Sequence, residues 1–265
     1  MSATLEATGL SKRFGAVAAV DGLDVALAPG EIRGLIGPNG SGKSTTMHLI
    51  SGYLRPDAGT IRLNGQVLNR LAVHRRAALG LGRTFQTPAV FLQLSVLDNV
   101  LVGCHAVDRV GTRVGDLFFR PWASKRVFNS LLERSVSTLD SVGLGDRMAD
   151  RAEDLSYGQQ KLLGLAQALV SDPRVLLMDE PLAGLGSVEM DRVIAIVKDL
   201  RLKGGSVLFA EHNVPEVMQL CDRITVLNFG TRIAEGTPGE IQRHPEVLDA
   251  YLGREDREEV DAHDQ

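Results

Sequence analysis

The sequence predicts an α/β fold, in which a core with a mostly parallel sheet carries an antiparallel β-subdomain and an inserted α-helical subdomain. Three observations support this prediction. Short strand-like runs broken by glycine turns fill the chain up to Val67, helical spacing dominates from about Gln86 to Ser171, and strand-like and helix-like runs alternate after that. Because strand–helix alternation is typical of a parallel sheet with helices on its faces, the helical block interrupts the core rather than following it.

The N-terminal part is expected to consist mostly of strands. Leu23–Leu27, Ile32–Ile36 and Thr60–Leu63 have the length and composition of strands. Asn64-Gly65 follows the last of them, and this dipeptide is a strong signal for a tight hairpin. A helix-like run, Thr45–Ile50, interrupts the strands.

The remaining elements follow from apolar spacing. Val175–Met178, Ser206–Ala210 and Ile224–Leu227 are apolar runs of buried-strand length, and a helix between the first two is expected to end at Gly204-Gly205. In the helical block, apolar residues recur on one face: Val127, Leu131, Leu132, Val136, Leu139 and Val142. We therefore expect residues 1–86 and 172–253 to form the core and residues 87–171 the helical subdomain. Residues 254–265 hold six acids and two arginines and are expected to be a disordered tail.

The composition fits a cytosolic enzyme. The 265 residues are 44% hydrophobic and 23% charged, which is enough for one large α/β domain with a subdomain. The net charge of −4 argues against a nucleic-acid partner held by a broad basic face. Cys104 and Cys221 lack metal-ligand spacing, so we expect free, buried thiols. The N-terminus has no signal pattern and no run approaches the roughly 18 apolar residues that span a bilayer, so any membrane role is expected to be peripheral.

The most informative motif is a phosphate-binding loop between a strand-like and a helix-like run, which is the context that its pattern G-x-x-x-x-G-K-[ST] requires. It reads Gly37-Pro38-Asn39-Gly40-Ser41-Gly42-Lys43-Ser44-Thr45. The glycines let the backbone approach a phosphate, and the N–H groups at the start of the helix favour an anion. We expect Lys43 to reach the β- and γ-phosphates and the Ser44 hydroxyl to ligate Mg²⁺. The alternative is a glycine-rich turn before an ordinary helix; the context favours a P-loop NTPase core.

Two carboxylates end the strand after the helical block. Asp179 and Glu180 follow Val175–Met178, and ligands of open α/β sheets bind beyond the carboxyl ends of strands. An aspartate there suits Mg²⁺, and the following glutamate suits the polarisation of an attacking water. The alternative is a solvated acid pair at a strand end.

Five further segments occur in the order and approximate spacing of the ATP-binding-cassette (ABC) ATPases, and the chain resembles that family over nearly its whole length. Leu155-Ser156-Tyr157-Gly158-Gln159-Gln160 resembles the signature sequence and opens a helix whose N-terminus can bind an anion. Gln86 stands at the position of the Q-loop glutamine and His212 at that of the switch histidine. Phe14 stands where the family stacks an aromatic ring on adenine, and Leu182–Glu189 at the D-loop position.

The resemblance implies an ATPase that uses ATP and Mg²⁺ and works as a head-to-tail pair, formed with a second ABC ATPase subunit that is either a copy or a sister. Glu180 would orient water, His212 would hold the γ-phosphate, and Gln86 would sense Mg²⁺ or that water. Three signature residues would contact the ATP of the other subunit: Ser156, Gly158 and Gln159. Taken singly, Phe14 could be a core aromatic, Gln86 a solvated amide and His212 a structural histidine. Their order and spacing favour the functional interpretation.

Segments without catalytic chemistry resemble the importer branch that serves branched-chain amino acids and related amides. They are the signature with Tyr157, Arg83-Thr84-Phe85-Gln86, Val96–Gly103, Ile233–Pro238 and Pro245–Gly253. The alternatives are an ABC ATPase of an export or lipid-extraction system and, from another class, a soluble ABC ATPase.

The sequence departs from the family pattern at two places. Gly186 and Ser187 replace the aspartate of most relatives and the asparagine–proline of this branch, which bears on the coupling of two sites, and Asn213 is a milder change.

As an importer ATPase, the chain is expected at the cytoplasmic face of the inner membrane as a peripheral subunit. Its partners would be transmembrane permease subunits and, indirectly, an extracytoplasmic solute-binding protein, with no nucleic acid. We expect the surface near Phe85–Leu94 to receive a permease helix. The run Arg109–Arg126, with Phe118, Phe119 and Trp122, either touches lipid head groups or a permease, or forms a helical hairpin with packed aromatics.

Overall fold

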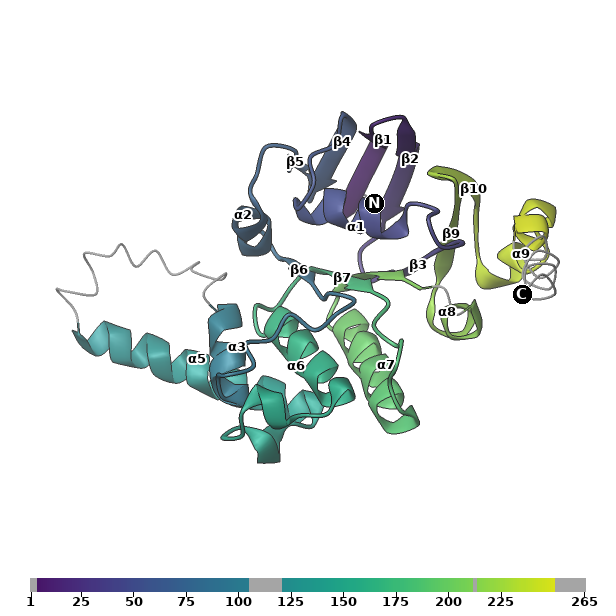
Figure 1. The fold of residues 1–265 in the computed structure, drawn as a ribbon. Coiled ribbons are helices and arrows are strands. Elements are labelled where there is room, and N and C mark those ends of the chain that lie inside the picture. Colours follow the sequence, from purple (N-terminus) through teal and green to yellow (C-terminus); the bar gives the residue numbers. More distant parts are fainter. Residues whose placement is uncertain (1–3, 105–120, 212–213, 251–265) are drawn as a thin grey trace. The chain divides into compact units, whose positions relative to one another are not determined.

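The computed structural model describes residues 4–104, 121–211 and 214–250, and the chain forms two compact units (Figure 1). Unit 1 consists of the segments Met1–Leu71 and Ser206–Gln265, and unit 2 is the intervening segment, Ala72–Gly205. The expected domain boundaries at residues 86/87 and 171/172 stay a prediction. Some features of the sequence lie outside the described residues: His212, Asn213, the aromatic side chains of the run Arg109–Arg126, and the tail 254–265.

Unit 1 contains an antiparallel sheet in the order β2-β1-β4-β5. Its strands are β1 (Leu5–Phe14), β2 (Val17–Leu27), β4 (Ala58–Leu63) and β5 (Gln66–Val67). The register pairs Leu5 with both Leu27 and Leu63, and all three side chains are buried. The turn between β4 and β5 has positive φ at Asn64 (48°) and Gly65 (79°), which confirms the predicted hairpin.

Unit 1 also contains a mostly parallel group of strands. They are β3 (Ile32–Ile36), β8 (Ser206–Ala210), β9 (Arg223–Asn228) and β10 (Thr231–Gly236). β3 pairs in parallel with β8 and β9, and β10 pairs antiparallel with β9. Every residue of β3 and β8 is buried, as central strands covered on both faces should be.

Three helices pack against these strands. α1 (Lys43–Ser51) contacts β2 and β8, α8 (Val214–Leu220) contacts β3, and α9 (Pro238–Ile241) contacts β9 and β10. In Figure 1, α1 lies between the antiparallel sheet and β3. α8 packs so closely on β3 that a Cβ at Gly34 would lie 2.6 Å from Cγ1 of Val217, so this position has no room for a side chain.

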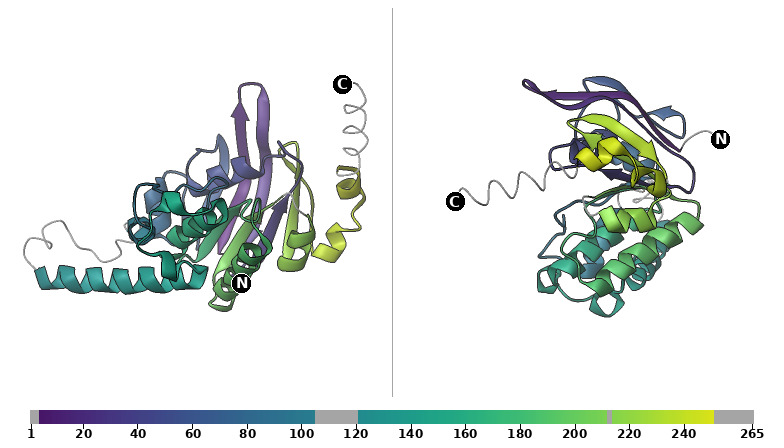
Figure 2. Two further views of the ribbon diagram at one scale, coloured as in Figure 1. Left: turned by 60° about the horizontal axis from the view of Figure 1, so that its bottom comes forward. Right: turned by 90° about the vertical axis from the view of Figure 1, so that its right-hand side faces the viewer.

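Unit 2 pairs two parallel strands, β6 (Leu81–Arg83) and β7 (Val175–Asp179), with a group of helices. The helices are α2 (Val73–Ala78), α3 (Val96–Cys104), α5 (Pro121–Val142), α6 (Tyr157–Leu169) and α7 (Ser187–Leu202), with short 3₁₀ helices η2 (Gly145–Arg147) and η3 (Ala152–Asp154). α6 contacts α3, α5, α7 and β6, so it forms the centre of the unit. The N-terminal half of α5 extends away from the other helices of unit 2 (Figure 2), and of the stripe expected on α5 only Leu139 and Val142 are fully buried.

These elements confirm the predicted fold class, with parallel strands, an antiparallel subdomain and a helix-rich segment inserted in the chain. β3 and β8 have the predicted bounds, and α7 ends just before Gly204, whose φ is 84°. Cys104 and Cys221 are free and buried as expected, and burial raises the pKa of Cys221 to about 12, with smaller contributions from Asp222 and Glu31. In the described part of the chain, no helix combines the length and hydropathy that crossing a bilayer requires.

Candidate functional site

The phosphate loop of unit 1 connects β3 to α1 and requires glycine at two positions. Gly37 has φ 151° and Gly42 has φ 104°. A Cβ at Gly37 would lie 2.1 Å from the carbonyl oxygen of Leu227, and a Cβ at Gly42 would lie 2.4 Å from that of Ala19. The motif's glycines are therefore needed for close approach of neighbouring backbone as well as for their dihedral angles.

The turn between β9 and β10 holds the phosphate loop through backbone hydrogen bonds. The Gly230 N–H donates to the Ser41 carbonyl (3.0 Å), and the Gly230 carbonyl accepts from the Asp21 N–H on β2 (2.9 Å). At the other end of the loop, the Thr46 N–H donates to the Gly42 carbonyl (2.8 Å) and begins α1. The loop thus keeps one backbone shape, and α1 begins at Lys43.

Lys43 is folded across this loop. Its Nζ donates to the carbonyls of Gly37 (2.6 Å) and Pro38 (3.1 Å), and the side chain is 6% exposed. The Oγ of Ser41 is buried and has no hydrogen-bond partner among the described residues. A cation, a buried hydroxyl and the N-terminus of α1 meet in a glycine cradle, so the residues present fit a phosphate group.

Phe14, the last residue of β1, is 49% exposed, so it is a surface aromatic and not a core residue. The ammonium of Lys12 lies 5.8 Å from its ring centroid. A partly exposed ring of this kind can stack on a base.

In unit 2, three predicted site residues and one arginine lie together at the ends of β6 and β7. They are Gln86, Asp179, Glu180 and Arg83. The Thr84 N–H donates to the Leu177 carbonyl (2.9 Å), which continues the β6–β7 pairing. Beyond it, the Gln86 Nε2 donates to Glu180 Oε2 (2.8 Å). Arg83 Nη2 lies 3.5 Å from Asp179 Oδ2, and both side chains are almost completely buried. The guanidinium of Arg83 also lies 5.0 Å from the ring centroid of Phe85.

The signature segment forms the start of α6. Ser156 is the N-cap: its hydroxyl accepts from the Gln159 N–H (3.2 Å), and the Gln159 side chain accepts from the Ser156 N–H (3.0 Å). This capping box fixes the helix N-terminus. Gly158 faces the D-loop, where a Cβ would lie 3.5 Å from Leu185 and Glu189.

The D-loop leads into α7, and Gly186 is the N-cap of that helix. Its φ of −72° and ψ of 167° are extended, so the conformation does not require glycine. The nearest atom to a Cβ there is the carboxylate end of Glu189, 2.7 Å away, which is a flexible group that can move. An aspartate or asparagine N-cap would therefore fit at position 186.

The predicted site residues thus fall into two groups. Phe14 and the phosphate loop belong to unit 1, whereas Gln86, Asp179, Glu180 and the signature belong to unit 2. The structure joins Gln86 to Glu180, and the grouping of the phosphate loop with Asp179 and Glu180 stays a prediction. Sequence reasoning missed the role of Arg83 beside Asp179, and it missed Lys161 on α6. The sequence signal that could have indicated Lys161 is a lysine at a position of the α6 helix that faces the apolar core.

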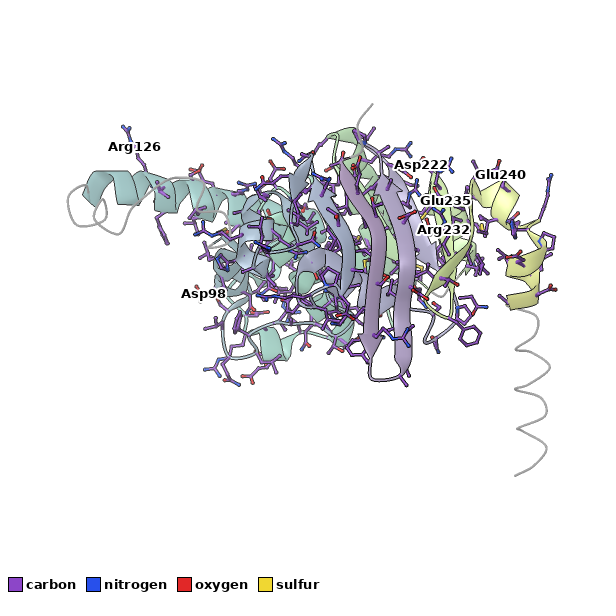
Figure 3. The ribbon with its side chains drawn as sticks, turned by 90° about the horizontal axis from the view of Figure 1, so that it is seen from above. Asp98, Arg126, Asp222, Arg232, Glu235 and Glu240 are labelled. Atoms are coloured by element: carbon purple, nitrogen blue, oxygen red, sulfur yellow. The ribbon has the colours of Figure 1, made fainter. Side chains whose placement is uncertain are left out.

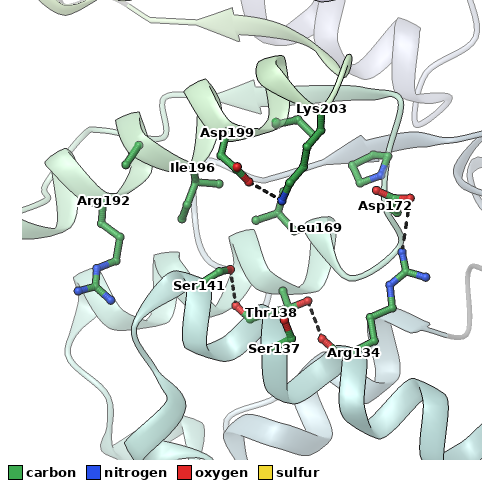
Figure 4. Close-up of a pocket in the computed structure, with 13 residues that line it drawn as sticks. Arg134, Ser137, Thr138, Ser141, Leu169, Asp172, Arg192, Ile196, Asp199 and Lys203 are labelled. Atoms are coloured by element: carbon green, nitrogen blue, oxygen red, sulfur yellow. Dashed lines mark hydrogen bonds and ion pairs between the residues drawn. The ribbon is translucent and has the colours of Figure 1, made fainter.

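A separate cavity of about 400 Å³ lies between α5 and α7 (Figure 4). Two ion pairs lie in its lining: Lys203 with Asp199 at 2.6 Å, and Arg134 with Asp172 at 3.9 Å. Two hydroxyls from α5 donate to their own helix: that of Thr138 to the Arg134 carbonyl (2.8 Å) and that of Ser141 to the Thr138 carbonyl (2.7 Å).

Comparison with known families and proteins gives a consistent result. The family model described as ABC transporter matches residues 20–183, and the model described as branched-chain amino acid ATP-binding cassette transporter matches residues 231–257. The chain is 37% identical over 250 residues to the high-affinity branched-chain amino acid transport ATP-binding protein LivG of Escherichia coli, covering 94% of this chain and 97% of the relative. It is 34% identical to the lipopolysaccharide export system ATP-binding protein LptB of Acidithiobacillus ferridurans, covering 96% and 98%.

Solved structures show the same similarity. The ADP conformation of an ATP-binding cassette of an ABC transporter aligns with a TM-score of 0.81 and 30% identity, covering 96% of this chain and all of the other. A nucleotide-free ATP-binding cassette from an ABC transporter aligns with a TM-score of 0.80 and 30% identity, covering 94% and 98%.

Proposed function

This chain belongs to the ATP-binding subunits of ABC transporters, and from that premise we propose that it is the Mg²⁺-dependent ATPase of an importer for branched-chain or other hydrophobic amino acids or related amides. The observation that supports ATP hydrolysis most directly is the hydrogen bond from Gln86 to Glu180 (2.8 Å), because it orients a carboxylate placed where the motif requires a general base. The similarity to LivG and the match at residues 231–257 support the class of solute.

The phosphate loop would bind the triphosphate of ATP. Lys43 would exchange its contacts with the carbonyls of Gly37 and Pro38 for the β- and γ-phosphate oxygens, and the N-terminus of α1 would add partial positive charge. Phe14 would stack on the adenine. These residues would bind the nucleotide but would not take part in cleaving its phosphate bond.

The catalytic residues would act on water and on the γ-phosphate. Gln86 donates to one carboxylate oxygen of Glu180 and so orients the carboxylate, which would accept a proton from the attacking water. His212 would contact the γ-phosphate. The Ser44 hydroxyl and the Asp179 carboxylate are oxygen donors of the type that Mg²⁺ prefers, and the ion would neutralise phosphate charge when bound.

Two subunits would share each ATP. The N-terminus of α6, fixed by the capping box of Ser156 and Gln159, would approach the nucleotide of the other subunit, and Gly158 would allow close contact. Binding of ATP would then hold the pair together, and hydrolysis would remove that attraction. The second subunit is either a copy of this chain or a related ATPase.

The remaining partners would be permease subunits, with a solute-binding protein on the far side of the membrane, and the chain would lie at the cytoplasmic face of the inner membrane. The exposed apolar residues of the loop before α3 support a permease contact: Phe91 is 51% exposed, Leu92 45% and Leu94 37%. The similarity to LptB keeps an export or lipid-extraction ATPase as the second candidate. Purification of native complexes separates the two, since amino-acid permease subunits or lipid-export subunits would accompany the chain.

Replacement of Glu180 by glutamine tests the mechanism. We expect Glu180→Gln to bind ATP with near wild-type affinity, to lose at least about 100-fold in turnover, and to accumulate an ATP-bound dimer, because the amide cannot accept the proton of water. Lys43→Ala is the control that should lose ATP binding instead. ATP turnover and size-exclusion chromatography with ATP measure both effects. Wild-type turnover in Glu180→Gln would remove Glu180 from the proposed role.

A further inference from the structure

Lys161 is a buried lysine on the signature helix, α6. Its side chain is turned into the protein and the residue is 9% exposed; the other buried residues of α6 are all apolar: Leu162, Leu163, Leu165, Ala166 and Ala168. Its Nζ donates to the carbonyl oxygens of Glu180 (2.9 Å) and Ala183 (2.6 Å). Burying an ammonium costs free energy unless hydrogen bonds compensate, so these two bonds are what keep the charge there. Both acceptors belong to the turn that leads from β7 into the D-loop.

That turn holds Glu180 in an unusual backbone conformation. Glu180 has φ 46°, in the left-handed region, which is strained for a non-glycine residue. Its carbonyl also accepts from the Ala183 N–H (3.4 Å), so the turn closes on itself around the Lys161 ammonium. Lys161 therefore holds the main chain of Glu180, while Gln86 holds its carboxylate (2.8 Å).

The rest of the N-terminal part of α6 also packs on this turn. A Cβ at Gly184, whose φ is 72°, would lie 3.3 Å from Cε1 of Tyr157. The Lys161 Nζ lies 5.7 Å from the Tyr157 ring centroid, so the ring covers the ammonium on one side. Lys161 is five residues beyond the N-cap Ser156, a distance of about 7–8 Å along a helix. A short, continuous stretch of helix therefore connects the capped end of α6 to the Lys161 contacts.

We propose that Lys161 is a positioning residue for ATP hydrolysis that connects the signature end of α6 to Glu180 of the same subunit. The inference rests on the proposed function, in which that end of α6 meets the ATP of the other subunit and Glu180 acts on water. Through Lys161, docking of α6 on one nucleotide sets the backbone of the glutamate that acts on the other. The residue touches neither ATP nor water; it acts by holding two carbonyl groups.

Lys161→Met tests the connection, because methionine has a similar length without a charge or a donor. We expect turnover at saturating ATP to fall at least about tenfold while the KM for ATP changes less than about twofold, since the phosphate loop is untouched. Lys161→Arg should restore most of the turnover, because a guanidinium also donates to two carbonyls. Lys203→Met is the matched control: Lys203 is a surface lysine of α7 paired with Asp199 at 2.6 Å, and its loss should leave turnover unchanged. A Lys161→Met turnover within about twofold of wild type overturns the proposal.

A second measurement does not depend on hydrolysis. Hydrogen exchange of the amides of residues 180–186, without nucleotide, should become at least about fivefold faster in Lys161→Met than in Lys203→Met, because the turn loses two hydrogen bonds. Unchanged exchange overturns the proposal even if turnover falls. Should Lys161→Met fail to fold, Lys161→Gln, whose shorter side chain cannot reach both carbonyls, is judged by the same two criteria. A wild-type chain without ATPase activity alongside its partner subunits would contradict the proposed function, and the exchange result would then still decide whether Lys161 holds the turn at Glu180.

Discussion

Gly40 and Gly42 lie in the same phosphate loop and both have positive φ, 78° and 104°, but they differ in the space around them. A Cβ at Gly40 meets nothing within 4 Å, whereas a Cβ at Gly42 would lie 2.4 Å from the Ala19 carbonyl oxygen. Gly40→Ala therefore adds only backbone strain and should destabilise the protein by about 1 kcal/mol. Gly42→Ala adds a clash with backbone that cannot move freely, so we expect a loss of about 3 kcal/mol.

Urea denaturation without nucleotide measures this difference, because ATP binding then does not contribute. The two variants form a matched pair in residue type, loop and sign of φ. Equal denaturation midpoints for the two would contradict the close approach of β2 to the loop.

At the scale of elements, buried charges join β3 to β10. Arg33, 4% exposed in the middle of an apolar strand, donates through Nε to Glu31 (2.8 Å) and through Nη1 to Glu235 (2.7 Å). Glu235 also accepts from Arg232 (2.7 Å), which is labelled beside it on β10 in Figure 3. Burial alone would raise the pKa of Glu235, but the hydrogen bond and charge of Arg33, with the charges of Arg232 and Arg223, lower it below its usual 4.5.

Glu235→Gln should destabilise the protein by about 1–3 kcal/mol at neutral pH, because Arg33 keeps a buried charge with one carboxylate fewer. Since the folded-state pKa of Glu235 is lowered, its stabilisation is fully present above the unfolded value of 4.5 and is lost as the pH falls through the folded value. The difference between wild type and variant should therefore shrink towards acid pH. Denaturant midpoints between neutral pH and about pH 3 measure it, with exposed Glu246→Gln as the control. A difference that stays constant with pH would contradict the assignment.

The same network shows what the sequence could not predict. Ile32–Ile36 was predictable as a strand from its apolar run, and the turn at Asn64-Gly65 from local chemistry, because both signals lie within a few residues. The partner of Arg33 on β10, Glu235, stands 202 positions away, and no local pattern connects them. The contacts of Lys161 are even harder to predict from the sequence, because its acceptors are main-chain carbonyls, which any residue type supplies. The phosphate loop was found because a fixed motif encodes its shape.

For the molecule as a whole, the proposed import function requires a surface that transmits ATP hydrolysis to a permease. The loop before α3 is fixed for such contact by Asn99, which is completely buried. Asn99 Oδ1 accepts from the Phe91 N–H (2.8 Å), and Asn99 Nδ2 donates to the Phe91 carbonyl (3.0 Å). From the other side, the Glu153 N–H donates to the Leu92 carbonyl (3.1 Å). The backbone is thus held while the apolar side chains remain exposed, which is what a preformed docking surface needs.

Phe91→Glu should therefore reduce the stimulation of ATP turnover by the permease subunits at least about fivefold. The reason is that a charge replaces an apolar contact with the permease. The basal turnover of the isolated ATPase should stay near wild type. Phe128→Glu is the matched control, because Phe128 is similarly exposed, 54% against 51%, and lies on α5 of the same unit rather than in the loop. Turnover measured with and without reconstituted permease, for both variants, gives the result. Equal stimulation of Phe91→Glu and Phe128→Glu would move the permease contact away from this loop, and with it the route by which hydrolysis reaches the membrane.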